Sequence, residues 1–455
     1  MNTDTMAKIE LGSPIRANLE ITEACPLACK HCYTYWGFSA TGKKVLPQDE
    51  SYELEHFSRI IDILSNRGVR TLTLTGGEPF EKRDILYPLI KFAKDRGMIV
   101  FVNTSAILVE QKDVEIIKSL NADGFLVSLM SCDKETNNRL AQADSYDKTI
   151  NGIKNLVKAG QNVNINMVCS KENYKDVRRT ALLVEKLGAW SFSAAPMMAA
   201  LSYPDYLAMR LSGSELNSVI HDLLWVKEHT KLLTTTLEAL PYCAFSENEL
   251  EELRPILSHS YCGAGLSDCA ISVSGDIRPC IMSGESVGNI LKDDWDDIWR
   301  KLSKWRSGDI LPSECLKCTA VDECGGGCRV SAKTVNGSFS ANDPYMVGRL
   351  SRKLAPAVSD THAMPGKSVF SKDTRLCISR KAVDRHEPFG GTVFIGNRAV
   401  FLKEGPYELY CRMKEMRAFS PAQIEADYGV NLIDFLNFIQ LLLDEGIVDI
   451  METYK

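Results

Sequence analysis

The chain has 455 residues, more than one ordinary domain, so two or three domains are expected. Hydrophobic residues at 45% and charged residues at 25% are typical of a globular protein with an ordinary core. A formal net charge of −6 argues against a nucleic-acid partner, which favours a basic surface. No apolar run is long enough to span a membrane, and residues 1–14 lack the pattern of a secretory signal. We therefore expect a cytoplasmic protein with neither a nucleic-acid nor a membrane partner.

Fifteen cysteines are unusual for such a chain. A reducing cytosol disfavours disulfides, so clustered cysteines indicate metal binding or catalysis. Three cysteines lie at positions 25, 29 and 32, and seven lie between residues 262 and 328. The others are scattered, and we interpret four of them as ordinary thiols: Cys132, Cys169, Cys243 and Cys411.

The first half of the chain alternates β-rich runs with amphipathic segments. Six strands are predicted at Arg16–Thr22, Thr71–Thr75, Ile99–Asn103, Gly124–Leu129, Val163–Val168 and Ser191–Ala195. Helical patterns between them cover Tyr52–Arg67, Lys82–Arg96, Tyr146–Ala159 and Asp176–Leu187. Strands separated by helices of this length predict parallel βαβ units. Six units predict an α/β fold, a partial (β/α)6 barrel with reactive groups at the carboxyl ends of its strands.

The second half has a different composition. A helical pattern near residues 213–229 gives way to a region rich in cysteine and glycine, with a hairpin predicted from Ala270–Val273 and Ile277–Arg278. A second hairpin joins Gly391–Ile395 to Arg398–Leu402, and helical patterns follow at Pro406–Met416, Ser420–Tyr428 and Leu432–Glu445. We expect a barrel over residues 1–229, a cysteine-rich domain over 230–350, a polar linker over 351–370, and a small winged-helix-like α+β domain over 371–455.

The first cysteine cluster follows the first predicted strand. Cys25, Cys29 and Cys32 have the spacing C-x3-C-x2-C, and Tyr33 comes next. Thiolates are the usual ligands of a 4Fe–4S cubane cluster. Three thiolates on one short loop can hold three irons and leave the fourth iron open to another ligand. The alternative is a zinc site with His31 as a further ligand.

This spacing resembles the signature of the radical S-adenosylmethionine (SAM) superfamily. The resemblance implies that SAM binds the open iron and is cleaved to a 5′-deoxyadenosyl radical, and that Tyr33 lies beside the adenine. Gly76, Gly77 and Glu78 precede Pro79 at the end of the second strand and resemble the superfamily's GGEP motif. The glycines permit close backbone approach to a ligand. Glu78 supplies a carboxylate for the ammonium group of SAM.

Three more residues match positions that contact SAM in the superfamily. Asn103 ends the third strand, and Ser128 ends the fourth, where it resembles the serine that contacts the ribose. Arg139 falls where relatives carry an arginine that pairs with the SAM carboxylate. The Asp-Gly that usually follows the serine is missing, since residues 129–131 are Leu-Met-Ser. A role as a helix cap or surface residue is the alternative for each of the three.

The second set of cysteines resembles the SPASM extension, which holds auxiliary iron–sulfur clusters in radical SAM enzymes that act on peptides and proteins. The chain reads Cys262-x12-Gly275-x4-Cys280, then Cys315-x2-Cys318-x5-Cys324-x3-Cys328. By this resemblance the first auxiliary cluster takes Cys262, Cys280 and Cys328, with Cys269 as a further candidate. The second takes Cys315, Cys318 and Cys324.

The SPASM pattern ends on one more cysteine, and this chain has Met346 in its place. A thioether is a poor iron ligand compared with a thiolate. The second cluster is therefore expected to have an open iron, to take another ligand such as Cys377, or to be absent, which gives one or two auxiliary clusters. The alternative is a zinc ribbon on the same cysteines.

The end of the chain resembles the small winged-helix peptide-binding proteins of the pyrroloquinoline quinone and mycofactocin pathways. The matching stretches are residues 387–394 and 399–402. Such domains bind the leader of a ribosomally made precursor peptide as an added strand. A generic winged-helix fold is the alternative, but the acidic segment 420–455 suits a DNA backbone poorly.

Together these resemblances predict a peptide maturase that binds a precursor peptide through its leader, with flavodoxin or ferredoxin as the reductant. The predicted modification is a thioether or C–C crosslink, an oxidative decarboxylation or an epimerisation. No general acid or base can be named from the sequence. One alternative is a related enzyme that acts on a whole protein or small molecule, as sulfatase-maturing and tetrapyrrole-pathway relatives do. The other is a zinc-bearing winged-helix regulatory protein.

Overall fold

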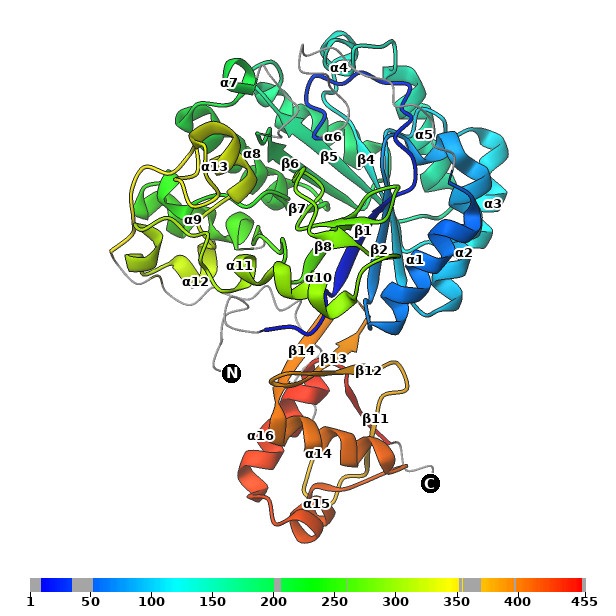
Figure 1. Ribbon diagram of the computed structural model, residues 1–455, viewed down its shortest axis with the longest axis vertical. Helices are drawn as coiled ribbons and strands as arrows, with labels where there is room; N and C mark the ends of the chain where they lie inside the picture. Colours follow the sequence, from blue (N-terminus) through cyan, green and yellow to red (C-terminus); the bar gives the residue numbers. More distant parts are fainter. Residues whose placement is uncertain are drawn as a thin grey trace. The chain divides into compact units, whose positions relative to one another are not determined.

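Figure 1 shows a computed structural model that describes residues 10–34, 52–199, 206–258, 260–351, 354, 370–396 and 398–451. The chain divides into two compact units. The first comprises Met1–Lys8 and Ser13–Ala357, and the second Ile9–Gly12 and Val358–Lys455. Most of the predicted linker, residues 351–370, lies outside the described residues. Within the described ranges, no helix is both long and apolar enough to cross a membrane.

A ten-stranded sheet in the order β10-β9-β8-β1-β2-β3-β4-β5-β6-β7 forms the frame of the first unit. The six predicted strands are β1 (Arg16–Glu20), β2 (Thr71–Thr75), β3 (Ile99–Thr104), β4 (Gly124–Ser128), β5 (Val163–Cys169) and β6 (Ser191–Pro196). Each pairs in parallel with the next. The predicted α/β fold with a partial parallel barrel is confirmed.

Helices pack along the outer face of this sheet (Figure 1). They are α1 (Leu54–Asn66), α2 (Arg83–Asp95), α3 (Val114–Leu120), α5 (Tyr146–Lys158), α6 (Val177–Lys186) and α8 (Gly213–His229). The short helix α4 (Lys134–Ala141) instead packs its Leu140 with Met130 and Met197. In α1 the buried residues Phe57, Ile60, Ile61 and Leu64 recur every three or four positions, which places them on one face. Burying that stripe against the sheet is what keeps the helix in place.

The cysteine-rich region contributes strands to the same sheet. β8 (Asp268–Ile271) pairs in parallel with β1, and β9 (Asp276–Arg278) and β10 (Gly288–Asn289) extend the sheet in antiparallel fashion. At the other edge, β7 (Leu233–Thr235) pairs in parallel with β6. The predicted hairpin exists as β8 and β9, but its pairing with β1 was not predicted, because local sequence does not specify a partner so far along the chain.

Further helices and turns complete the first unit. They are α7 (Tyr206–Met209), α9 (Glu247–Leu257), α10 (Trp295–Lys301), α11 (Ser303–Arg306), α12 (Val321–Cys324) and α13 (Arg329–Asn336), with the single turns η5 (Tyr242–Ala244) and η6 (Cys315–Lys317). Arg329 is buried and donates through Nη1 to the carbonyls of Phe339 and Ala341 at 3.1 and 2.8 Å. A buried cation thus holds the loop that follows α13.

The second unit has a separate core. It contains a three-stranded antiparallel sheet of β12 (Val383–Glu387), β13 (Gly390–Ile395) and β14 (Arg398–Lys403), and a pair formed by β11 (Leu376–Ile378) and β15 (Val448–Ile450). The helices are α14 (Glu404–Glu415), α15 (Pro421–Tyr428) and α16 (Leu432–Asp444). Tyr410, Met413, Phe419, Ile424, Ile439 and Leu442 form the centre of its core. The second predicted hairpin is present as β13 and β14; its turn residue Asn397 lies outside the described residues.

Candidate active site

The loop that carries Cys25, Cys29 and Cys32 leaves the carboxyl end of β1, and all three thiols are partly exposed. The last turn of α4 supports this loop. Lys30 N donates to Leu140 O at 2.9 Å, and Ala28 N donates to Ala141 O at 3.3 Å. These bonds fix the backbone from which the thiols project.

The loop after β2 supports the cysteine loop from the other side. Gly77 N donates to Thr22 O at 2.7 Å, and Glu78 N donates to Ala24 O at 2.8 Å. A Cβ added to Gly76 would lie 2.2 Å from Thr22 O, and one added to Gly77 would lie 2.1 Å from Ala24 O. The close backbone approach that the two glycines were predicted to allow is therefore made to the chain's own cysteine loop.

Glu78 is buried, with four donors on its carboxylate. Oε1 accepts from Thr104 Oγ1 at 2.6 Å and from Phe80 N at 3.2 Å. Oε2 accepts from Ser105 N at 2.8 Å and from the Ser105 hydroxyl. Burial raises the pKa of Glu78, and these hydrogen bonds oppose the shift. The carboxylate ties the end of β2 to the end of β3, and the ammonium group of a ligand would be an additional donor to it.

Tyr33, Asn103 and Ser128 lie near the same edge of the sheet. The Tyr33 hydroxyl is 3.4 Å from Thr75 Oγ1 at the end of β2, and burial raises the Tyr33 pKa. Asn103 is partly exposed near the carboxyl end of β3, where it is in register with Leu126 of β4. Ser128, at the end of β4, is exposed. The carboxyl ends of parallel strands meet at one edge, so the structure brings these three predicted residues to one side of the sheet.

Arg139 is linked to the cysteine loop through a residue that the sequence did not indicate. Arg139 Nε donates to Glu172 Oε2 at 2.7 Å, and Lys30 Nζ donates to Glu172 Oε1 at 3.0 Å. Against the effect of burial, these two cations hold the pKa of Glu172 below its usual range. Glu172 follows β5 in no recognisable motif, so only the fold could place it between α4 and the loop.

His31 lies between two of the cysteines on the loop. Its Nδ1 is buried without a hydrogen-bond partner among the described residues, and burial lowers its pKa to about 4. The imidazole is therefore neutral at neutral pH. Three thiols with an unpartnered imidazole nitrogen beside them form a donor set that fits a metal cluster and a polar ligand bound to it.

The structure brings three thiols of the cysteine-rich region together. Burial raises the pKa of Cys262, Cys280 and Cys328 to about 12 each, and each of them is also raised by one of the other two. Cys269 lies on β8 in register with Ala17, and its pKa is raised by burial and by the Asp268 carboxylate rather than by another cysteine. The three-thiol group matches the predicted ligands of the first auxiliary cluster.

Glu238 also lies beside this group, and sequence reasoning missed it. Burial raises its pKa to about 7, and its charge acts on both Cys262 and Cys328. Carboxylates occur as metal ligands in proteins, so Glu238 is a candidate for the coordination position that the three thiols leave open. No motif surrounds it in the sequence.

The remaining predicted ligands form a second group on short turns. Cys315 begins η6, Cys318 follows this turn with its N–H donating to Cys315 O at 3.0 Å, and Cys324 ends α12. Nowhere in the described chain do three His, Cys, Asp or Glu side chains converge as they would around one metal ion. The thiolates of a cubane bind different irons and do not require such convergence.

Comparison with known proteins identifies the two parts that carry the cysteines. Residues 19–184 match the radical SAM superfamily, and residues 262–319 match SPASM, an iron–sulfur cluster-binding domain. The chain is an enzyme with a radical SAM domain and a SPASM domain. Its cofactors are therefore SAM, the iron–sulfur cluster that binds SAM, and iron–sulfur clusters held by the SPASM domain. The assignment of individual ligands stays a prediction.

The relatives of this chain are named for different products. It is 24% identical to the AdoMet-dependent heme synthase of Methanosarcina barkeri, over 73% of this chain and 96% of the relative. It is 27% identical to the antilisterial bacteriocin subtilosin biosynthesis protein AlbA of Bacillus subtilis, over 71% of this chain and 69% of the relative. The structure of Streptococcus suis SuiB bound to S-adenosylmethionine superimposes with a TM-score of 0.60, at 20% identity, over 74% of this chain and 78% of SuiB.

Proposed function

We propose that this radical SAM enzyme modifies a ribosomally made precursor peptide and that its second unit binds the leader of that peptide. When bound, the cluster on Cys25, Cys29 and Cys32 supplies an electron to SAM and so generates the radical that abstracts a substrate hydrogen. The chain's own residues position this chemistry. Gly76 and Gly77 allow the two loops to pack, and the salt bridges of Glu172 hold the cysteine loop against α4.

The observation that best supports a peptide substrate is an open sheet edge in the second unit. In the order β12-β13-β14, the strand β14 pairs only with β13 among the described residues. An extended peptide can add to such an edge through its backbone hydrogen bonds. This arrangement supports the predicted likeness to the small peptide-binding proteins of the pyrroloquinoline quinone and mycofactocin pathways.

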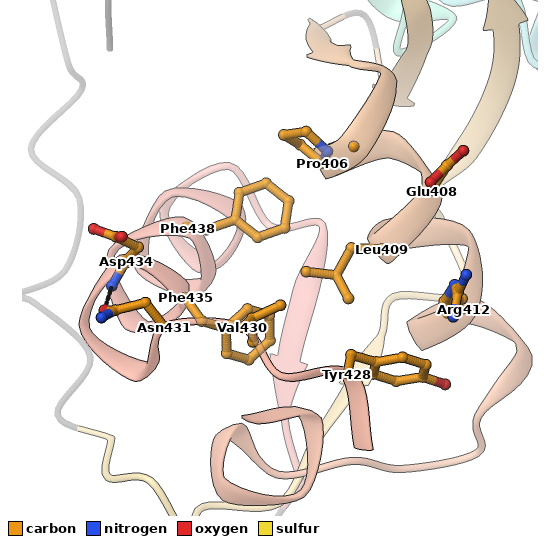
Figure 2. Close-up of a pocket in the computed structure, with 11 residues that line it drawn as sticks. Pro406, Glu408, Leu409, Arg412, Tyr428, Val430, Asn431, Asp434, Phe435 and Phe438 are labelled. Carbon is orange, nitrogen blue, oxygen red and sulfur yellow. Dashed lines mark hydrogen bonds between the residues drawn. The ribbon is translucent and has the colours of Figure 1, made fainter. Parts of the chain in front are cut away.

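A groove of about 500 Å³ in the same unit can accept side chains of that peptide. Figure 2 shows Leu409 of α14 and Phe438 of α16 projecting into the space between the two helices, with Tyr428 below them. The Arg412 guanidinium lies 5.0 Å from the centre of the Tyr428 ring. Apolar walls with a cation and carboxylates at the rim suit a short amphipathic segment.

Two relatives support the same proposal. The relative from Bacillus subtilis is named for the biosynthesis of a bacteriocin, subtilosin. SuiB has also been solved bound to its precursor peptide SuiA. The electron donor we propose is flavodoxin or ferredoxin, and the compartment we propose is the cytoplasm, where thiols stay reduced.

The similarity to heme synthases supports a second candidate, a small-molecule substrate. That similarity spans 96% of the relative but only 73% of this chain, so part of this chain has no counterpart in the heme synthase. The matched families also end at residue 319, before the second unit. The two candidate functions therefore differ in whether residues 370–451 take part: a peptide substrate gives these residues a role, and a small-molecule substrate does not.

The test uses the full chain, reconstituted with iron and sulfide under anaerobic conditions. Fluorescent synthetic peptides encoded by the short open reading frames beside the gene are titrated into it, and 5′-deoxyadenosine is measured with SAM and a reductant. One peptide should bind and should be converted. Phe438→Glu should weaken its binding at least about tenfold, whereas Ile433→Glu, an exposed position on the same helix, should not. Peptides that neither bind nor react, together with turnover of a tetrapyrrole, would favour the second candidate.

A further inference from the structure

The chain lacks the last cysteine of the SPASM pattern, although the segment that should carry it is held in place. Asp343 accepts hydrogen bonds from Cys328 N at 2.9 Å and from Tyr345 N at 2.8 Å, and Met346 N donates to Asp343 O at 2.9 Å. Met346 therefore occupies an ordered turn close in sequence and space to the cysteines. What it lacks is a thiolate.

A different segment approaches the second group of thiols. The turn η5 carries Cys243, and its first residue, Tyr242, donates its N–H to Cys324 Sγ at 3.3 Å. Cys324 Sγ in turn lies 4.0 Å from Leu240 O. A Cβ added to Gly327 would be 3.0 Å from Pro241 Cδ. Backbone and side-chain contacts thus fasten the segment 240–244 to the turn that follows α12.

The same turn also lies against Cys315, because a Cβ added to Gly326 would be 3.4 Å from Cys315 Sγ. On the neighbouring turn, Cys318 N donates to Cys315 O at 3.0 Å. Cys243 directly follows Tyr242, whose N–H contacts Cys324 Sγ. Four thiols therefore come from three short segments that contact one another.

We propose that Cys243 is the fourth thiolate ligand of the second auxiliary cluster, in the place that the SPASM pattern gives to residue 346. A cubane takes four thiolates, and the group of Cys315, Cys318 and Cys324 offers three. Cys243 completes the set. Repulsion between neighbouring thiolates is relieved when iron binds them, so metal binding and deprotonation are coupled. The Tyr242 N–H, which already points at a ligand sulfur, is the kind of donor that tunes such a cluster.

This assignment replaces two expectations drawn from the sequence. Cys243 was interpreted as an ordinary thiol, and Cys377 was offered as the substitute ligand. Cys377 lies on β11 of the second unit, opposite Asp449 of β15, and the charges that act on it are those of Asp449 and Arg380. The inference rests on the SPASM chemistry of the first unit and is independent of the substrate.

The test counts clusters in a chain from which the SAM-binding cluster has been removed. In the Cys25→Ala/Cys29→Ala/Cys32→Ala background, anaerobic reconstitution should give about eight irons per chain if both auxiliary cubanes form. Adding Cys243→Ser should remove about four irons, or leave a paramagnetic three-iron cluster visible by electron paramagnetic resonance without added reductant. Cys132→Ser, a partly exposed thiol of the same unit, is the matched control and should keep the full iron content.

A rescue experiment distinguishes the loss of a cluster ligand from the loss of the folded structure. Met346→Cys, added to the Cys243→Ser chain, restores the thiolate at the position that the SPASM pattern uses, so the iron content should return. Iron, sulfide and spectra that are unchanged by Cys243→Ser would overturn the proposal. Iron lost in Cys243→Ser and not regained with Met346→Cys, in a protein whose circular dichroism is altered, would overturn it as well, because the effect would then be structural.

Discussion

Glu20 Oε1 lies 2.7 Å from Arg278 Nη2, and both side chains are 1% exposed. Glu20 ends β1 just before the first cysteine loop, and Arg278 ends β9 two residues before Cys280. Arg278 Nη1 also donates to Ile281 O and Ser283 O at 3.2 and 3.1 Å. One buried ion pair therefore connects the strand that precedes the loop of Cys25, Cys29 and Cys32 to the loop that carries Cys280.

Removing one partner of this pair should be costly. Arg278→Met leaves the Glu20 carboxylate buried without its cation, and the free energy of unfolding should fall by about 3–5 kcal/mol. Urea unfolding of the metal-free protein measures this. Glu20→Leu/Arg278→Met should recover most of the loss, because an apolar pair leaves no buried charge unpaired. If Arg278→Met were as stable as the wild type, water would have to reach the Glu20 carboxylate, and the ion pair would not be buried as described.

Gly77→Ala should disrupt the loop that carries Cys25, Cys29 and Cys32. The new Cβ would lie 2.1 Å from Ala24 O, so the two loops must separate. We expect a loss of about four irons per chain and of SAM cleavage, measured by iron analysis and 5′-deoxyadenosine formation. Gly213→Ala is the control, because nothing lies within 4 Å of its added Cβ. Full iron content in Gly77→Ala would contradict the role given to this glycine.

Glu78→Gln should destabilise the chain even without cofactors. An amide keeps one acceptor oxygen and turns an NH2 group toward the donors from Thr104, Ser105 or Phe80, which should cost about 1–3 kcal/mol. Chemical unfolding of the metal-free protein tests this. Glu81→Gln, at an exposed position three residues on, should have no measurable effect. If both variants unfold alike, the four-donor arrangement contributes nothing to stability.

Glu238 should make the metal-free protein less stable as the pH rises. Its pKa is raised by burial from an ordinary 4.5 to about 7, so the folded state retains a proton that the unfolded state has lost. The stabilisation is complete below about pH 4.5 and is lost as the pH rises through about 7, with a limit of about 3 kcal/mol. Glu238→Gln should lack this loss. Unfolding of both proteins at pH 5 and pH 8 should show a difference that grows with pH, and a constant difference would contradict the assignment.

Local sequence was enough for the framework of this enzyme. The order of the six strands followed from the alternation of β-rich and amphipathic runs, and the structure places all of them within two residues of the predicted bounds. Cys25, Cys29 and Cys32 could be proposed as ligands because they lie on one short loop, where spacing along the chain is enough to indicate a cluster. The Gly76-Gly77 motif was found for the same reason, although its contact with the cysteine loop was not.

Only the tertiary structure decided the contacts between distant segments. Tyr242 and Cys324 are 82 residues apart in the chain, yet a hydrogen bond joins them and brings Cys243 to the second group of thiols. Glu172, Glu238 and the partner of Glu20 likewise carry no motif, because each acts through neighbours supplied by another strand or loop. Spacing along the chain determines a site when its ligands share one loop. When the ligands come from several loops, packing of the whole sheet determines which of them meet.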